Sequence, residues 1–332
     1  MNRFRFMLAA LACLALGAAA SSGSWAQDKF PVKPVKIVVP YGPGGATDIV
    51  ARIVAEHMRQ SLGQSFVVEN KPGAFGIVAI QEMGNARPDG YTLMVGNVST
   101  NAITPVIVPE RLKVNYARDV APVTNLIDVP AFLVVATNNF APKSVPELIA
   151  YAKKNPGKTR YGTVGAGSYP HYDAAFFAKR AGDLDMIAIH NKQGAAGVVN
   201  DMVTGDVQMA FLNVASTASQ IRAGKLRPIA VVNQTRLPDH PDVPTMKEAG
   251  FPDVGTVAWN AMFAPAATPR PVLEALHRGA LAALATDAAK GALLKQGFNI
   301  VPSASLEEAR TWLASEMTAW KTITDAVKIE TE

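Results

Sequence analysis

The chain has 332 residues, of which 49% are hydrophobic and 18% are charged, and this is the composition of an ordinary globular protein. A chain of this length is typical of two domains, each large enough to bury a core without a metal ion or a disulfide bond. The formal net charge is +5, but the sequence contains no run of five basic residues, so no nucleic-acid partner is expected.

The first 26 residues have the pattern of a signal peptide. Two arginines precede an almost purely apolar segment, residues 6–20, and a small-x-small sequence, Ser24-Trp25-Ala26, follows it. This order predicts cleavage before Gln27 and a protein that works outside the cytoplasm, in the periplasm. The alternative is a membrane anchor, but the apolar segment is shorter than the ~20 residues that a spanning helix needs.

The only cysteine, Cys13, lies inside this segment. The alternative of a lipoprotein anchored at Cys13 is disfavoured, because residues 14–16 are apolar where a polar tether is expected. The mature chain is then expected to have neither disulfide bonds nor a thiol nucleophile. Its five histidines lack metal-ligand spacing and no Gly-x-Ser-x-Gly motif occurs, so we predict no metal, no cofactor and no catalytic residue.

Strand-like and helical patterns alternate along the chain from Val35. Strands are predicted at residues 35–39, 66–68, 91–95, 132–136, 186–189, 207–212 and 229–232. One helix has apolar residues on one face from Ile49 to Leu62 and ends at Gly63. Ser144-x-x-Glu147 and Ser305-x-x-Glu308 are capping boxes that begin two further helices, and the chain from about Arg270 is mostly helical.

This alternation predicts an α/β fold with largely parallel sheets that are covered by helices on both faces. No flexible linker rich in glycine and serine is present, so two lobes would be joined by ordered segments. The strand-like stretches at residues 128–136 and 255–264 are the candidates for these crossovers.

The most informative loop, Tyr41-Gly42-Pro43-Gly44-Gly45-Ala46-Thr47-Asp48, lies between the first strand and the first helix. Its three glycines let the backbone approach a ligand closely. The unpaired N–H groups and partial positive charge of a helix N-terminus favour an anion, and a carboxylate or a phosphate would fit equally well. A glycine-rich turn that binds no ligand is the alternative.

The spacing of this loop disfavours two nucleotide-binding interpretations. In a dinucleotide fingerprint, Thr47 would replace the third glycine or alanine, although Glu69 stands roughly where a ribose-binding acid is expected. A phosphate-binding Walker loop is excluded because no Gly-Lys-Ser/Thr sequence follows.

Two later loops also follow predicted strands. Residues 162–171 include Gly167, Ser168 as a candidate helix cap, and His171, which either faces a cleft or packs at the helix start. Residues 190–194 include Lys192 and Gly194, and ligands bind at such carboxyl ends of strands in open α/β sheets. A solvated turn is the alternative for residues 190–194.

With these loops in view, the chain resembles the Bug receptor family, the solute-binding components of tripartite tricarboxylate transporters. The resemblance covers nearly all of the mature chain from Phe30. Its motifs, in order, are KIVVPYGPGG at 36–45, VENKPG at 68–73, PDGYTL at 88–93, IRAGKLR at 221–227, PDVPT at 241–245 and FAPAATP at 263–269.

The resemblance implies a type II periplasmic-binding-protein fold, in which two lobes joined by two crossover strands close on a ligand. Lobe 1 would comprise residues 27–128 and 257–332, and lobe 2 residues 129–256. The loop at 41–48 would grip a carboxylate through backbone N–H groups and bridging waters. Further pocket residues would be Ser99, Thr100, Gly167, Ser168, His171, Lys192, Gly194 and Asn213.

The sequence departs from the family pattern at three places. Residues 191–194 read Asn-Lys-Gln-Gly where many members have Pro-Tyr-Lys-Gly, so Lys192 replaces an aromatic wall. Leu212-Asn213 stands for a common Asp-Asn pair, and Thr104-Pro105 for the familiar Asn-Pro. The identity of the ligand therefore does not follow from the resemblance, and Lys192 predicts a second negative or strongly polar group on it.

The resulting prediction is a monomeric, non-catalytic periplasmic receptor that binds a small carboxylate or dicarboxylate and delivers it to membrane transporter subunits. Two other functions stay open at this point. The same lobes would serve a signalling partner equally well, and a secreted enzyme on this fold would have to turn a ligand over.

Overall fold

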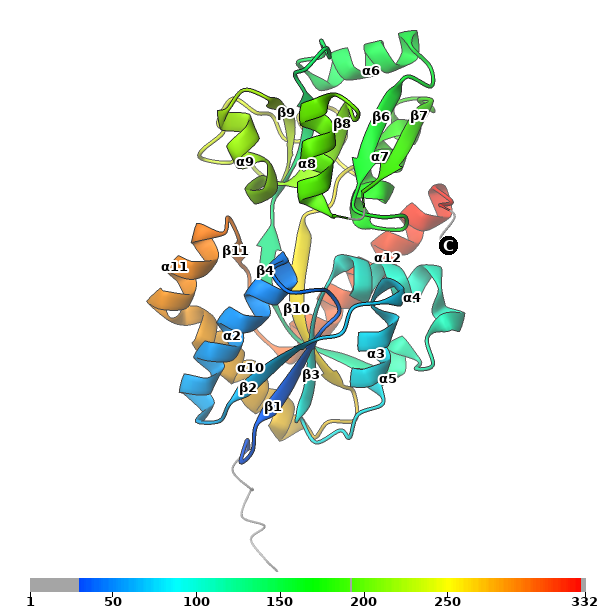
Figure 1. Cartoon of the computed structure of the whole chain (residues 1–332). Helices are drawn as coiled ribbons and strands as arrows, with labels where there is room; N and C mark the ends of the chain where they lie inside the picture. Colours follow the sequence, from blue (N-terminus) through cyan, green and yellow to red (C-terminus); the bar gives the residue numbers. More distant parts are fainter. Residues whose placement is uncertain (1–29, 192, 330–332) are drawn as a thin grey trace, which may run out of the picture.

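The computed structural model describes residues 30–191 and 193–329, and these form two lobes with strands crossing between them (Figure 1). The predicted signal peptide and Lys192 lie outside the described residues. Each lobe contains one β-sheet with helices on both of its faces, which is the predicted α/β architecture. No helix among the described residues is both long and apolar enough to cross a membrane.

Lobe 1 contains a six-stranded sheet with the strand order β11-β4-β10-β3-β1-β2. Its strands are β1 (Val35–Val39), β2 (Phe66–Asn70), β3 (Thr92–Asn97), β4 (Val120–Val129), β10 (Ala258–Pro265) and β11 (Asn299–Ile300). Its helices are α2 (Ala46–Leu62), α3 (Ile77–Gly84), α4 (Thr104–Ile107), α5 (Tyr116–Asp119), α10 (Arg270–Ala285), α11 (Asp287–Lys295) and α12 (Leu306–Ala326). Two short 3-10 helices, η1 (Ala74–Gly76) and η3 (Pro109–Arg111), and a short π-helix, η2 (Ser99–Ile103), complete the lobe.

Lobe 2 contains a five-stranded sheet with the order β7-β6-β8-β5-β9. Its strands are β5 (Ala131–Ala136), β6 (Thr159–Thr163), β7 (Met186–His190), β8 (Met209–Asn213) and β9 (Leu226–Val232). Its helices are α6 (Val145–Lys154), α7 (Tyr169–Arg180), α8 (Ala195–Thr204) and α9 (Val214–Arg222). Successive side chains of its central strands are buried on opposite faces of the sheet, because helices cover both.

Local sequence signals set several of these boundaries. The hydroxyl of Ser144 accepts the N–H of Glu147 at 3.3 Å, and the hydroxyl of Ser305 accepts the N–H of Glu308 at 3.1 Å. The two serine N-caps are therefore confirmed. The return bonds of the capping boxes go to the residue before each cap, since Glu147 accepts the N–H of Lys143 at 3.0 Å and Glu308 accepts that of Ala304 at 2.8 Å. Gly63 ends α2 in the left-handed conformation, with φ of 73°, and its N–H bonds to the carbonyl of Arg59.

The expectation of largely parallel sheets is wrong. The pairs β1–β2, β1–β3, β6–β7 and β6–β8 are parallel, but β10 runs antiparallel to β3 and β4, and β5 runs antiparallel to β8 and β9. The reason is the crossover itself. Because β5 and β10 each enter a sheet from the other lobe, each runs against strands whose carboxyl ends face that lobe.

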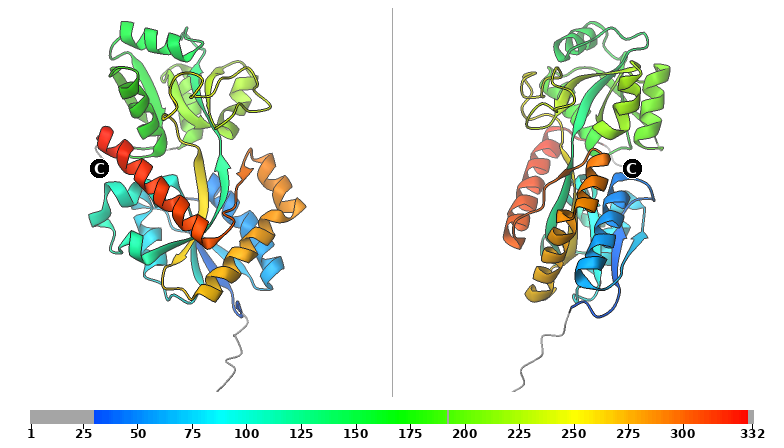
Figure 2. Two further views of the ribbon diagram at one scale, coloured as in Figure 1. Left: turned by 180° about the vertical axis from the view of Figure 1, so that it is seen from behind. Right: turned by 90° about the vertical axis from the view of Figure 1, so that its left-hand side faces the viewer.

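The two crossovers lie side by side between the lobes (Figure 1). Strand β4 leads through Pro130 into β5, while β10 brings the chain back and pairs with β4 from Ala258↔Val129 to Pro265↔Val120. Helix α12 lies beside these strands and reaches lobe 2 (Figure 2). There the ring of Trp320 on α12 lies 5.8 Å from the ring of Tyr172 on α7.

Candidate functional site

A cleft of about 580 Å³ is lined by residues of both lobes. From lobe 1 it receives Pro40, Tyr41, Gly42, Pro72, Gly73, Ala74, Phe75, Gly76, Asn97, Ser99 and Thr104, and from lobe 2 residues 164–169. These residues follow the carboxyl ends of β1, β2, β3 and β6, where ligands bind in open α/β sheets. The volume lies within the range of roughly 300–1,000 Å³ that is usual for small-molecule sites.

Tyr41 is held at the cleft by a hydrogen bond. Its hydroxyl donates to Oδ1 of Asn97 at 2.6 Å, and the same oxygen accepts the N–H of Thr100 at 3.3 Å. Burial raises the pKa of the Tyr41 hydroxyl, against the opposing effect of its hydrogen bonds, so this group stays protonated at neutral pH.

Beneath this contact a chain of polar side chains runs into lobe 1. The hydroxyl of Thr100 donates to Oδ1 of Asn101 at 2.6 Å, and Nδ2 of Asn101 donates to the hydroxyl of Tyr116 at 2.8 Å. Thr100 is only 1% exposed. It therefore supports the cleft from below and does not line it.

The second half of the first loop is held by Asp48. The Asp48 carboxylate accepts the N–H of Gly44 at 3.0 Å, Nδ2 of Asn70 at 2.9 Å and Nε of Arg52 at 3.0 Å. Burial raises the pKa of this carboxyl, but the hydrogen bonds from Arg52, Gly44 and Asn70 outweigh it, so the pKa of Asp48 is lowered. Asp48 thus supplies an internal anion at the start of α2 and orders the loop.

A left-handed turn follows β2 and forms another part of the wall. Ala74 and Phe75 have φ of 45° and 57° between Gly73 and Gly76, which also have positive φ. Non-glycine residues in this region cost about 1–3 kcal/mol each and cluster at functional sites. The turn is secured by Thr104, whose hydroxyl donates to the carbonyl of Phe75 at 2.9 Å.

The loop between β6 and α7 supplies the lobe 2 side. Ser168 stands at the N-cap position of α7, but its hydroxyl donates to the carbonyl of Gly165 at 2.7 Å and makes no cap bond, so the predicted side-chain cap is wrong. The hydroxyl of Thr163 lies 2.6 Å from Nδ1 of His190 and 3.2 Å from the N–H of Gly165. These bonds order the loop that faces lobe 1.

His171 is buried behind that loop. Its Nδ1 accepts the N–H of Gly167 at 3.3 Å, and its ring lies 4.7 Å from the ring of His190. Burial, and then the charge of His190, lower the pKa of His171 to about 4, so its imidazole is neutral at physiological pH. Of the two predicted roles, the packing role matches this geometry.

An acidic group joins lobe 2 to the returning chain. Asp173 on α7 is buried and accepts the hydroxyl of Thr256 at 2.7 Å and its N–H at 3.0 Å. Thr256 lies just before β10. Burial raises the pKa of Asp173 to about 7, although both hydrogen bonds from Thr256 lower it.

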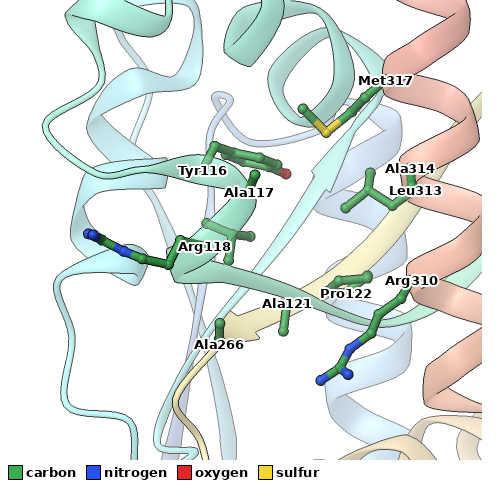
Figure 3. A pocket seen from close by; sticks show the side chains of 11 residues that line it. Tyr116, Ala117, Arg118, Ala121, Pro122, Ala266, Arg310, Leu313, Ala314 and Met317 are labelled. Carbon is green, nitrogen blue, oxygen red and sulfur yellow. The ribbon is translucent and has the colours of Figure 1, made fainter.

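Another cavity, of about 420 Å³, is lined by lobe 1 alone (Figure 3). It lies between α5, β4 and α12. Its two arginines contact neighbouring acids, since Arg118 lies 2.7 Å from Asp119 and Arg310 lies 4.0 Å from Glu307. Closure of the lobes would not enclose a ligand there.

Comparison with known proteins agrees with this geometry. The model of the tripartite tricarboxylate transporter family receptor matches residues 50–329. The chain belongs to this family. Its members are periplasmic solute-binding receptors and not enzymes, so the predicted family, fold and non-catalytic nature are confirmed.

Solved structures of similar proteins share the whole architecture. The periplasmic binding protein BugD is 30% identical, with a TM-score of 0.77, and the match covers 91% of this chain and 100% of BugD. Rpa4515 of Rhodopseudomonas palustris, solved with adipate, is 29% identical, with a TM-score of 0.79 and coverage of 90% and 99%. MatC of the same organism, solved with malate, is 28% identical, with a TM-score of 0.76 and coverage of 89% and 99%.

Five predicted site residues of this receptor line the cleft: Tyr41, Gly42, Ser99, Gly167 and Ser168. Others lie outside its lining: Gly44, Gly45, Ala46, Thr47, Asp48, Thr100, His171, Gly194 and Asn213. Gly194 and Asn213 occupy the N-cap positions of α8 and α9, and Oδ1 of Asn213 accepts the N–H of Ser216 at 2.8 Å. Lys192 lies outside the described residues.

Sequence reasoning missed Asn97, Tyr169 and the turn that contains Phe75. The turn had a readable signal, because a bulky aromatic residue is unusual between closely spaced glycines at the end of a strand. The described residues that line the cleft include no charged side chain. The cleft therefore offers hydroxyl and N–H donors on an otherwise largely apolar surface.

Proposed function

We propose that this receptor encloses a small carboxylate between its lobes and delivers it to the membrane subunits of a tripartite transporter. The observation that carries this proposal is a single cleft lined by glycine-rich loops of both lobes. A ligand that contacts both loops favours the closed arrangement over the open one, which is how binding and closure are coupled.

The cleft is suited to a carboxylate by its donors. Ser99 carries a hydroxyl group, and the loops at 41–48 and 164–168 supply backbone N–H groups beside helix N-termini. The hydroxyls of Tyr41 and Ser168 donate to Asn97 and to the carbonyl of Gly165. Neutral donors of this kind stabilise an anion without a salt bridge. The adipate of Rpa4515 and the malate of MatC support the carboxylate class.

The limits of the lobes form part of the proposal. We assign residues 27–128 and 257–332 to lobe 1 and residues 129–256 to lobe 2. Strand β4 ends at Val129 and strand β10 begins at Ala258, which supports limits at these places. We further propose that the receptor is a monomer and that its mature form begins near Gln27.

A thermal-shift screen tests the ligand class. A ligand at ~100 times its dissociation constant stabilises the protein by about 2.7 kcal/mol, and this raises the melting temperature measurably. Mono- or dicarboxylates are expected to raise it, whereas sugars and uncharged amides are not. A shift with uncharged compounds alone would contradict the proposal.

Two further measurements test closure, oligomeric state and processing. Small-angle scattering should show a monomer whose radius of gyration decreases when a stabilising carboxylate is added. The intact mass of protein recovered from the producing cell should correspond to a chain that begins at or near Gln27. A retained N-terminal segment carrying lipid on Cys13 would contradict the soluble mature form.

A further inference from the structure

Phe75 combines an unfavourable backbone conformation with a position on the cleft. Its φ and ψ are 57° and 27°, in the left-handed region that glycine adopts freely and a bulky side chain adopts at a cost. Glycines stand one residue after it and two residues before it, so glycine is compatible with this turn. A glycine at position 75 would form the same turn without strain, and it would lack only the ring.

The surroundings of Phe75 hold its ring at the cleft. The hydroxyl oxygen of Thr104 lies 2.9 Å from the carbonyl of Phe75 and 3.0 Å from that of Ser99, so its one proton is shared between them. The guanidinium of Arg111 lies 5.8 Å from the ring centroid, within reach of a cation–π contact. The backbone of Phe75 is therefore fixed by Thr104, and Arg111 lies beside its ring.

Several other residues that line the cleft are apolar. Pro72 and Ala74 come from the same turn, and Pro40 lies at the end of β1. From lobe 2, Val164 and Ala166 contribute apolar side chains to the same cleft. Polar side chains line the same cleft, among them Ser99 and Thr104 beside the turn, so the cleft offers both polar groups and an apolar surface.

We propose that Phe75 determines specificity, and that the preferred ligand is a carboxylate with a flat, apolar body such as an aromatic ring. This inference rests on the proposed carboxylate receptor and names the class of ligand within it. Aromatic rings attract each other in offset-stacked and edge-to-face arrangements beyond the effect of buried area alone. A hydroxylated or flexible aliphatic acid has no flat face to present to the ring.

Calorimetric titration of the mature protein with benzoate, adipate and malate tests this inference. Benzoate is expected to bind more tightly than either aliphatic acid. In Phe75→Gly, affinity for benzoate should fall by at least about tenfold, whereas affinity for malate should change by less than about twofold. Phe75→Tyr, which keeps the ring, should retain the affinity for benzoate.

The melting temperature of the unliganded variant distinguishes a role of Phe75 in specificity from a role in stability. Because glycine relieves the left-handed strain, unliganded Phe75→Gly should melt at the same temperature as the wild type or higher. Equal benzoate affinity in Phe75→Gly and wild type, or tighter binding of adipate or malate by the wild type, would overturn the inference and leave the carboxylate receptor standing. Failure of all carboxylates to bind would contradict the proposed function itself.

Discussion

Among single residues, Asp48 accepts a backbone hydrogen bond that the sequence pattern assigns to a ligand. The loop at 41–48 was expected to present N–H groups to a bound carboxylate. One of these groups, the N–H of Gly44, donates instead to the Asp48 carboxylate, which Arg52 and Asn70 also contact. Asp48 is 3% exposed, so its bonds are well shielded from water.

Replacement of Asp48 by asparagine is therefore expected to destabilise the receptor. The change removes the charge that Arg52 contacts and weakens the bond to Gly44, at a cost of about 1–3 kcal/mol. Urea denaturation at neutral pH would measure it. Asp325→Asn is a matched control, because Asp325 pairs with Lys321 at 2.7 Å on the surface and such exposed pairs contribute ~1 kcal/mol at most. Equal effects of the two substitutions would contradict the positioning role.

Lys192 is predicted to contact a second negative or strongly polar group of the ligand. The described lining of the cleft has no charged side chain, so a cation from residues 190–194 would be the counter-ion available to such a group. Lys192→Met should then lower the affinity for the preferred ligand at least tenfold, or about 1.4 kcal/mol. Calorimetric titration would measure this. An unchanged affinity, with unchanged melting of the free protein, would make Lys192 a surface residue.

Between elements, Asp173 links α7 to the segment that returns to lobe 1. Its ionisation lowers the stability of the folded state. Its pKa is about 7 in the folded state against an ordinary value of 3.8. Between these values the folded protein binds more protons than the unfolded chain. The stabilising contribution of Asp173 is thus complete below pH ~4 and is lost as pH rises through about 7.

The variant Asp173→Asn cannot ionise and should lack this pH dependence. From pH 5 to pH 8, the free energy of unfolding of the wild type should fall relative to that of the variant by roughly 2–3 kcal/mol. Urea denaturation of both proteins at the two pH values would measure this. His171 titrates in both proteins, so its contribution cancels in the difference. Parallel pH profiles would show that Asp173 stays ionised in the fold.

Elements with a strong local signal could be predicted from the sequence. The strand at 35–39, the end of α2 at Gly63 and both serine N-caps depend on residues close together in the chain. The direction of β5 and β10 could not be predicted in the same way, because it depends on which lobe each strand comes from. Alternation of strands and helices indicates the class of fold. The direction of a strand in a sheet built from separate parts of the chain depends on the tertiary structure.

The cleft was predictable in part for the same reason. Tyr41, Gly42, Gly167 and Ser168 lie in glycine-rich loops that the sequence marks by composition. Asn97 has no such signal, since its role comes from the hydroxyl of Tyr41, which lies 56 residues earlier in the chain. Asn213 shows the reverse, because the side chain that was assigned to a ligand caps its own helix.

At the scale of the whole molecule, α12 connects the lobes in addition to the crossover strands. Trp320 is 2% exposed and contacts Tyr172 of lobe 2. Closure rotates one lobe against the other. The contact between Trp320 and Tyr172 lies between the lobes and limits how far they can move apart.

Trp320→Ala is expected to lower the free energy of unfolding by about 3–5 kcal/mol, and to widen the range of lobe orientations. Urea denaturation measures the first effect, and small-angle scattering without ligand measures the second as a larger radius of gyration. Trp312→Ala is the control, because the ring of Trp312 lies 4.6 Å from that of Trp259 on the lobe 1 strand β10. A similar change in scattering for both variants would argue against a special role for Trp320.

The place of β10 in its sheet also determines the order in which the molecule can be assembled. The five strands of lobe 2 come from one uninterrupted stretch, residues 131–232, so this lobe has all its strands once that stretch is available. Lobe 1 begins earlier in the chain but cannot be completed, because β10 lies between β3 and β4 and starts only at Ala258. In a chain that emerges from its N-terminus, the edges of β3 and β4 that face β10 therefore stay unpaired until the inserted lobe has passed. Those edges are where an incomplete chain is most exposed to aggregation.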